Sequence, residues 1–274
     1  MSQLPTLTLN DGARIPRLGF GVFQVSDEET SDAVGHALKA GYRSIDTAAV
    51  YGNESGVGRA LAASDVPRDE LFVTTKLWNA DQGYDSTLRA FDDSLAKLGL
   101  DHVDLYLVHW PAPARDLYVD TWRALEKLVA DGRIRTAGVS NFQPAHLRRL
   151  LDSSDLVPAV NQIELHPALQ QRELRALHAD LGIATEAWSP LAQGAVLADP
   201  VVVEIAARHG KSPAQVVLRW HLQLGNIVIP KSVTPARIRE NIDVFDFTLS
   251  GEEMDAFGGL DRGLRTGPDP DILD

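Results

Sequence analysis

Short apolar runs alternate with amphipathic helical patterns along this chain, and that alternation constrains its fold more than any other feature. Eight runs are typical of β-strands, and several are almost continuously apolar, as parallel strands buried on both faces are. They are Leu18–Gly21, Ser44–Asp46, Leu71–Lys76, Val103–His109, Ile134–Val139, Ala159–Ile163, Ile183–Trp188 and Ile227–Pro230. Between them, apolar residues recur at helical spacing, for example at Leu88, Phe91, Leu95 and Leu98. The pattern predicts one α/β domain over residues 1–274, a (β/α)₈ TIM barrel rather than a doubly wound sheet.

Turn residues mark where the predicted elements end. Glycines stand where helices should stop, at Gly99, Gly132, Gly182 and Gly225. Ahead of the first barrel strand, Thr6–Leu9 and Arg14–Pro16 flank an Asp-Gly pair, which predicts an N-terminal β-hairpin. The segment after Gly258 is rich in Gly, Asp and Pro and is predicted to be a loop.

Composition excludes several kinds of chemistry. The chain has no cysteine, so disulfides, thiolate nucleophiles, iron–sulfur clusters and Cys-ligated zinc are excluded. A formal net charge of −12 argues against a nucleic-acid or anionic-membrane partner. No run approaches the roughly 20 apolar residues of a membrane helix, and the first eleven residues lack the basic and apolar regions of a signal peptide. We therefore expect a cytoplasmic protein.

Polar residues at the ends of the predicted strands are the candidates for chemistry, because active sites of such barrels lie where strands end and loops begin. Asp46, Lys76 and His109 occupy these positions, and Tyr51 follows in the loop after Asp46. A buried lysine needs a carboxylate partner, and Asp46 is the obvious one. By themselves, the Asp–Lys pair fits a structural salt bridge equally well, and His109 fits a core histidine better. Four titratable groups at one barrel mouth favour function instead. A lysine ammonium is expected to lower the pKa of the Tyr51 phenol, which could then act as a general acid.

Several longer motifs resemble the signatures of the aldo-keto reductases. Residues 41–48 and 51–58 resemble the first signature, residues 138–142 the second, and residues 229–241 the third. Residues 160–167 are also similar to the family. The resemblance covers nearly the whole chain and is strongest to bacterial 2,5-diketo-D-gluconate reductases. It implies an NADPH-dependent reductase of aldehydes, ketones or sugar-derived dicarbonyls, with a β/α barrel and no metal.

The resemblance assigns a catalytic tetrad of Asp46, Tyr51, Lys76 and His109. Tyr51 would protonate the carbonyl oxygen while NADPH delivers hydride to the carbonyl carbon. Lys76, held by Asp46, would lower the pKa of Tyr51, and His109 would orient the carbonyl. This agrees with the physical requirement that donors face the oxygen on which negative charge develops.

Cofactor contacts follow from the same resemblance. The nicotinamide carboxamide would be bound by Ser140, Asn141 and Gln162, and its ring would stack on Trp188. The loop over the pyrophosphate contains Leu191, Gln193 and Gly194. The adenosine 2′-phosphate would be held by Lys231, Ser232, Val233 and Arg237, and the adenine by Glu240 and Asn241. The structural alternatives are a core aromatic at Trp188 and a solvated basic face at Lys231 and Arg237.

The substrate pocket is the least specified part. Its aromatic walls would be Phe23, Trp78 and Trp110, and the tail Leu260–Asp274 would cover the barrel mouth, as in relatives. Aromatic walls accept many carbonyl compounds without specifying one.

We expect the protein to be a monomer. Two alternatives are an NADPH-binding sensor of the same fold, similar to the β subunits of potassium channels, and a metal-dependent barrel hydrolase. The intact tetrad disfavours the sensor, and the poor set of metal ligands disfavours the hydrolase.

Overall fold

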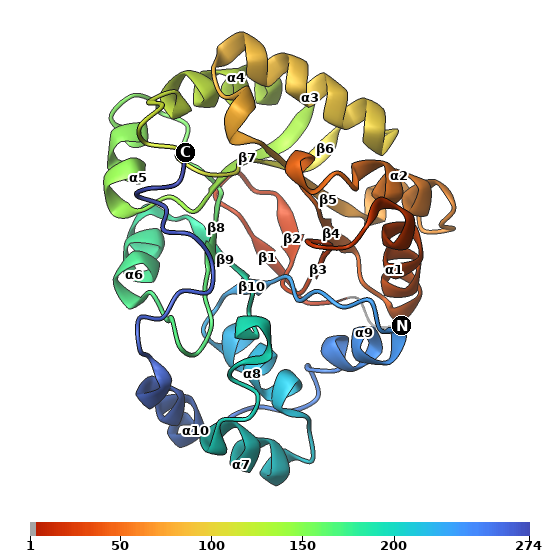
Figure 1. Ribbon diagram of the computed structural model, residues 1–274, viewed down its shortest axis with the longest axis vertical. Coiled ribbons are helices and arrows are strands. Elements are labelled where there is room, and N and C mark those ends of the chain that lie inside the picture. The colour runs from red at the N-terminus through yellow and green to blue at the C-terminus, as the bar shows by residue number, and fades with distance from the viewer. Residues whose placement is uncertain (1–3) are drawn as a thin grey trace.

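The structure is a computed structural model that describes residues 4–274, and its centre is a ring of eight parallel strands surrounded by helices (Figure 1). A hairpin, β1 (Thr6–Thr8) and β2 (Arg14–Pro16), precedes the ring. The ring strands are β3 (Phe20–Gly21), β4 (Ser44–Asp46), β5 (Phe72–Leu77), β6 (Val103–Val108), β7 (Ile134–Ser140), β8 (Val160–Glu164), β9 (Ala184–Trp188) and β10 (Ile227–Val228). All eight predicted strands are present, and the hairpin and the (β/α)₈ barrel are confirmed.

The strands follow one another around the ring in chain order, from β3 to β10. The two outer strands meet through a parallel bridge between Leu18 and Val228. The Gly19 amide donates to the Val228 carbonyl at 2.8 Å, and the Gly21 amide donates to Pro230 at 3.2 Å. These contacts close the barrel, so no strand edge is left open where β3 and β10 meet.

Helices cover the outside of the ring, as Figure 1 shows. They are α1 (Asp27–Ala40), α2 (Glu54–Ala62), α3 (Tyr84–Leu98), α4 (Tyr118–Ala130), α5 (Pro144–Leu151), α6 (Arg172–Leu181), α7 (Pro200–His209), α8 (Pro213–Gln223), α9 (Pro235–Ile242) and α10 (Gly251–Ala256). Short 3₁₀ turns occur at η1 (Ala49–Tyr51), η2 (Arg68–Glu70), η3 (Asn79–Asp81), η4 (Ala192–Gly194) and η5 (Phe257–Leu260). The segment after Gly258 is therefore a loop except for the end of η5.

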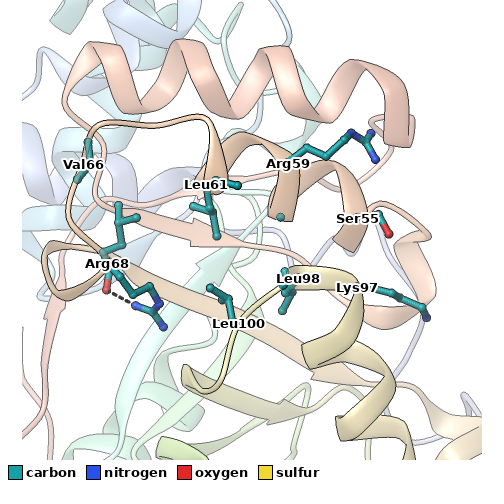
Figure 2. A pocket seen from close by; sticks show the side chains of 12 residues that line it. Ser55, Arg59, Leu61, Val66, Arg68, Lys97, Leu98 and Leu100 are labelled. Carbon is teal, nitrogen blue, oxygen red and sulfur yellow. Dashed lines mark hydrogen bonds between the residues drawn. The ribbon is translucent and has the colours of Figure 1, made fainter.

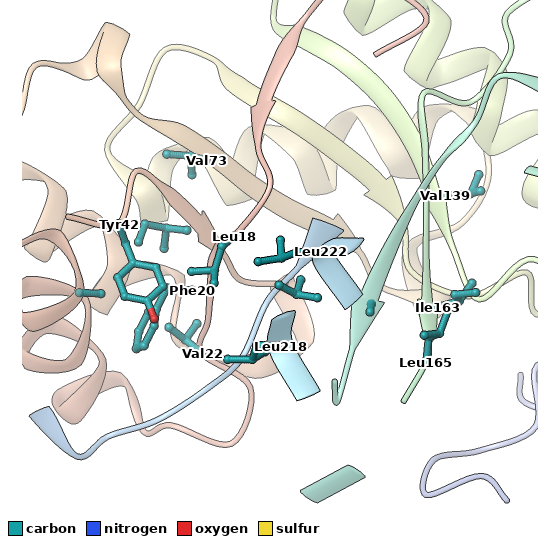
Figure 3. Packing of buried hydrophobic residues seen from close by; sticks show 14 of the residues in the cluster. Leu18, Phe20, Val22, Tyr42, Val73, Val139, Ile163, Leu165, Leu218 and Leu222 are labelled. Carbon is teal, nitrogen blue, oxygen red and sulfur yellow. The ribbon is translucent and has the colours of Figure 1, made fainter. Parts of the chain in front are cut away.

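The predicted helical spacing buries one face of each helix against the strands. On α3, Phe91, Leu95 and Leu98 are buried, and Gly99 ends the helix in a left-handed conformation. The main hydrophobic core fills the layer between ring and helices, where Figure 3 shows Phe20 beside Tyr42. Their rings meet edge to face with centroids 5.5 Å apart, a favourable aromatic geometry.

The inside of the barrel changes character along its axis. A second apolar cluster joins Leu9 and Ile15 of the hairpin region to inward-facing strand residues, namely Phe72, Leu105, Leu107, Val160 and Ile227. The hairpin therefore closes the end at which strands begin. Because side chains alternate along a strand, the inward row of β5 runs from Phe72 through Thr74 to Lys76. The polar residues at the other end form the site.

Candidate active site

Lys76 is the centre of the tetrad and is fully buried on β5. Its ammonium donates to Asp46 Oδ1 at 2.6 Å, to the Thr47 carbonyl at 2.9 Å and to Tyr51 Oη at 3.4 Å. Asp46 ends β4, and Tyr51 lies in η1, which follows it. A lysine ammonium has three N–H donors, so every donor has a partner. The predicted Asp46–Lys76 pair is therefore present, and it orients Lys76 toward Tyr51.

The charges of this pair keep Lys76 protonated. Burial by itself lowers the pKa of Lys76, but Asp46, Tyr51 and Glu186 raise it, and the net shift is upward. Burial raises the pKa of Tyr51, Lys76 lowers it, and Asp46 raises it again, so the net shift is also upward. Lys76 lowers the pKa of Tyr51 as predicted, but the expected net lowering is not found, because the desolvation of the phenolate outweighs the effect of this cation.

His109 follows β6 and faces the same mouth. Burial, and then the charge of Lys76, hold its pKa well below the usual value, so the imidazole is neutral near pH 7. Its ring centroid lies 5.7 Å from that of Tyr51 and 5.5 Å from that of Trp78. A neutral imidazole carries one N–H donor, which it can offer to a carbonyl oxygen beside Tyr51.

Aromatic rings surround Tyr51 and His109. The Phe23 ring centroid lies 4.9 Å from that of Tyr51, and Phe23 is 54% exposed. Trp110 is buried, with its centroid 6.4 Å from His109 and 6.4 Å from Trp188. The three residues predicted to form the substrate pocket therefore all lie against or near the tetrad, with Phe23 open to solvent.

The residues predicted to bind the carboxamide form one hydrogen-bonded group. Ser140 Oγ donates to the Gln162 carbonyl at 2.8 Å, and Asn141 Nδ2 donates to Ser140 Oγ at 3.0 Å. Trp188 Nε1 donates to Asn141 Oδ1 at 2.8 Å. Asn141 adopts a left-handed backbone with φ of 64°, a conformation that asparagine tolerates better than most residues. The fold brings these four residues together from β7, β8 and β9.

The remaining predicted cofactor residues lie in two places. Leu191, Gln193 and Gly194 form the loop after β9, around η4. The segment from the end of β10 to α9 contains the others, namely Lys231, Ser232, Val233 and Arg237, followed by Glu240 and Asn241. Lys231 and Arg237 are exposed, and neither forms an ion pair with a residue in the described range 4–274. Glu240 accepts a hydrogen bond from Ser212, at the N-terminus of α8.

Comparison with known proteins decides the family. A model of the aldo/keto reductase family matches residues 17–262. The chain belongs to the aldo/keto reductase family. An aldo-keto reductase of Mycolicibacterium smegmatis is 61% identical over 97% of each chain. The methylglyoxal reductase DkgA of Yersinia pestis is 57% identical over 100% of this chain and 99% of that protein. A crystal structure of a Gox0644 mutant in complex with NADPH is 49% identical, with a TM-score of 0.96 and 100% of each chain covered.

The family motifs of the sequence are thus confirmed, and this reductase is an oxidoreductase that uses a nicotinamide cofactor to reduce carbonyl groups. Within residues 4–274, no helix is long and apolar enough to cross a membrane.

Two buried acidic residues at the site are not among the predicted site residues. Glu186 lies on β9, and Gln162 Nε2 donates to its Oε2 at 2.9 Å. Glu164 ends β8 and accepts hydrogen bonds from the backbone of Thr266 and Gly267 in the tail, at 2.5 and 3.1 Å. A spacing of two residues relates Glu164 to Gln162 and Glu186 to Trp188, so strand alternation from the predicted cofactor residues could have found both.

The tail crosses the barrel mouth next to Trp188, as the resemblance implies. Figure 1 shows it running in dark blue from α10 past α6 toward α5. A Cβ atom on Gly267 would lie 2.4 Å from the Trp188 ring, so only glycine allows this close approach. The tail is therefore packed on the aromatic residue predicted to face the nicotinamide.

A surface cavity of about 490 Å³ lies elsewhere, between α2, the turn before β5 and the end of α3 (Figure 2). Leu61, Leu98 and Leu100 line it, together with basic side chains that pair with carboxylates. Arg59, for example, lies 2.8 Å from Asp27. None of the tetrad residues lines this cavity.

Proposed function

We propose that this protein is an NADPH-dependent reductase of small aldehydes and dicarbonyl compounds, with Tyr51 as the proton donor. The observation that carries the proposal is the buried Lys76, whose three donors meet Asp46, Thr47 and Tyr51 at an aromatic-lined mouth. A carboxylate-held ammonium beside a phenol supports the transfer of a proton from that phenol.

The proposed roles follow from the charges. A bound nicotinamide cofactor supplies a hydride to the carbonyl carbon. The raised pKa of Tyr51 keeps its proton in place until a substrate oxygen gains negative charge. Lys76 remains positive and stabilises the phenolate that Tyr51 becomes, while Asp46 holds Lys76. His109 is neutral and donates a hydrogen bond that orients the substrate oxygen.

The residues present fit a phosphorylated nicotinamide cofactor. The chain has a net charge of −12, so a 2′-phosphate needs local cations. Lys231 and Arg237 are exposed and form no ion pair with any described residue, and Ser232 lies beside Lys231. At the other end, Trp188 offers a ring, and the Ser140–Asn141–Gln162 group offers oxygen acceptors. We therefore assign NADPH rather than NADH, with Leu191, Gln193 and Gly194 along the pyrophosphate.

The substrate class rests on the pocket and on the relatives. Phe23, Trp78 and Trp110 place aromatic rings beside Tyr51 and His109, and apolar walls of this kind suit a small carbonyl compound. DkgA of Yersinia pestis, at 57% identity, carries the name methylglyoxal reductase. We propose 2-oxoaldehydes of that size as substrates.

A carbonyl panel tests the proposal. Methylglyoxal, glyoxal, simple ketones and sugar-derived dicarbonyls are offered with NADPH or NADH, and cofactor oxidation is followed at 340 nm. We expect turnover with 2-oxoaldehydes, faster with NADPH. Tight NADPH binding without turnover of any carbonyl would replace the reductase with a cofactor-binding sensor, and a preference for NADH would reject the 2′-phosphate assignment.

A further inference from the structure

Glu186 is a fully inward-facing carboxylate for which the proposed chemistry has no role. It is 1% exposed and lies on β9, two residues before Trp188. Its strand register places it directly beside Gln162 on β8. Gln162 Nε2 donates to Glu186 Oε2 at 2.9 Å and to Asp46 Oδ2 at 2.8 Å. One side-chain amide thus joins two carboxylates that belong to different strands.

These two contacts fix the orientation of the Gln162 amide. A side-chain amide has two N–H donors and one carbonyl acceptor. The Asp46 carboxylate can only accept, so it turns Nε2 rather than Oε1 toward itself, and the second N–H of Nε2 reaches Glu186 Oε2. Gln162 Oε1 is left as the free group, with no hydrogen bond to any side chain or backbone group of residues 4–274. With Asp46 alone, one N–H would have no partner and the amide could turn.

We propose that Glu186 is a positioning residue that, together with Asp46, holds Gln162 so that its Oε1 accepts a hydrogen bond from the N–H₂ of the nicotinamide carboxamide. This inference rests on the proposed function, in which Gln162 contacts that group. Asp46 then has two partners in the site: its Oδ1 holds Lys76, and its Oδ2 holds Gln162. Asp46 thereby holds both Lys76, which contacts the proton donor, and Gln162, which contacts the cofactor. Glu186 supplies the second partner of the Gln162 amide.

The cost of Glu186 supports a functional reason for its presence. Burial and the nearby Asp46 raise its pKa to about 8, although Gln162 and Lys76 lower it. Even in the protonated form that this pKa favours near pH 7, a buried carboxyl group with one amide donor costs more than an apolar residue of similar size. The layer beneath it in the barrel is apolar, with Leu107 and Val160, so an apolar side chain would suit packing alone.

A pair of ligands tests the hydrogen bond directly. The 3-acetylpyridine analogue of NADP⁺ carries a methyl group where the carboxamide carries N–H₂. We expect wild-type protein to bind NADP⁺ more tightly than the analogue by roughly 2- to 13-fold, the effect of one neutral hydrogen bond. In Glu186→Leu the ratio should fall toward 1. In Glu186→Gln it should be retained, because the new amide oxygen can accept from Gln162 Nε2.

Two further measurements separate the possible failures. Adenosine 2′,5′-bisphosphate lacks the nicotinamide, so an unchanged affinity for it shows that a variant is folded. If Glu186→Leu fails this check, Glu186→Ala replaces it with the same expected ratio.

Gln162→Leu is the reference variant, because it removes the proposed contact with the carboxamide itself. If it keeps the full ratio, the proposed cofactor contact of Gln162 is wrong. If it loses the ratio while Glu186→Leu keeps it, the inference about Glu186 is wrong. Equal loss in Glu186→Gln and Glu186→Leu would also overturn it.

Discussion

The two ends of the barrel differ in which residues adopt a left-handed backbone. Within residues 4–274, all non-glycine residues with positive φ lie in loops that follow strands, at Gln24, Ala112, Asp116, Asn141, Gln171, Ser189, Ala192 and Gln193. The turns that lead from helices back into strands use glycine instead, at Gly41, Gly99, Gly132, Gly182 and Gly225. A side chain in this conformation costs about 1–2 kcal/mol. The active end therefore accepts strain that the opposite end avoids.

Buried charge follows the same division. Asp46, Lys76 and Glu186 lie inside the active half of the barrel, whereas Phe72 and Leu105 fill the other half. Side chains needed for chemistry occupy strained or desolvated positions at one end, and glycine and apolar packing stabilise the other. Substitutions at the two ends should thus separate activity from stability.

Tyr51→Phe should have the largest effect. Loss of the proposed proton donor is expected to lower kcat by about 10²–10⁴-fold. The free energy of unfolding should change little, because the only hydrogen bond that Tyr51 Oη makes with residues 4–274 is the 3.4 Å contact from Lys76. Steady-state kinetics and urea unfolding measure the two quantities. Tyr84→Phe, on the exposed side of α3, is the matched control. Near-normal turnover of Tyr51→Phe would reject the assignment.

Glu186→Gln should stabilise the fold more at alkaline pH than at acidic pH. The pKa of Glu186 is raised from 4.5 to about 8, mainly by burial. The folded protein therefore keeps a proton that the unfolded chain loses in this window, and stability falls as the pH rises from 4.5 to 8. Relative to wild type, the free energy of unfolding of the variant should rise across this window by on the order of 1 kcal/mol for each pKa unit of the shift. Urea unfolding near pH 5 and pH 9 checks this, and a pH-independent difference contradicts it.

Arg237→Ala should weaken NADPH binding by roughly 10- to 150-fold, because a hydrogen-bonded charge contact contributes about 1.5–3 kcal/mol. NADH lacks the 2′-phosphate, so its affinity should hardly change. Arg239→Ala removes the same charge from the other side of α9 and serves as the control, since residues two apart on a helix do not face each other. Dissociation constants at fixed salt decide: equal weakening of both cofactors would mean that Arg237 does not contact the phosphate.

The smallest effects come from a matched pair of glycines. Gly182 follows α6 with φ of 70°, and Gly194 lies in η4 with φ of 95°; a Cβ on either meets no atom within 4 Å. Alanine should therefore cost each variant about 1–2 kcal/mol of stability through backbone strain alone. Gly194→Ala should also weaken NADPH binding, whereas Gly182→Ala should leave it unchanged. Thermal unfolding and cofactor titration compare them, and identical cofactor affinities would show that the η4 loop does not contact the cofactor.

Sequence alone determined the order of strands and the convergence of Asp46, Lys76 and His109. Strand and helix periods are local properties, and in a parallel barrel every strand ends at the same face. Residues that end successive strands must therefore meet, whatever the details of packing. The glycines after helices were predictable for a similar reason, since a left-handed residue after a helix is a local requirement.

Tertiary structure decided what depends on neighbours across strands. In the sequence, Glu186 is an acidic residue in a short strand with no visible partner. The register between β8 and β9 places Gln162 beside it. The sign of the Tyr51 pKa shift likewise could not be obtained from the presence of Lys76, because it depends on how much water the fold removes from the phenol. Sequence spacing shows which groups approach one another, but desolvation and the direction of each hydrogen bond are set by the whole barrel around them.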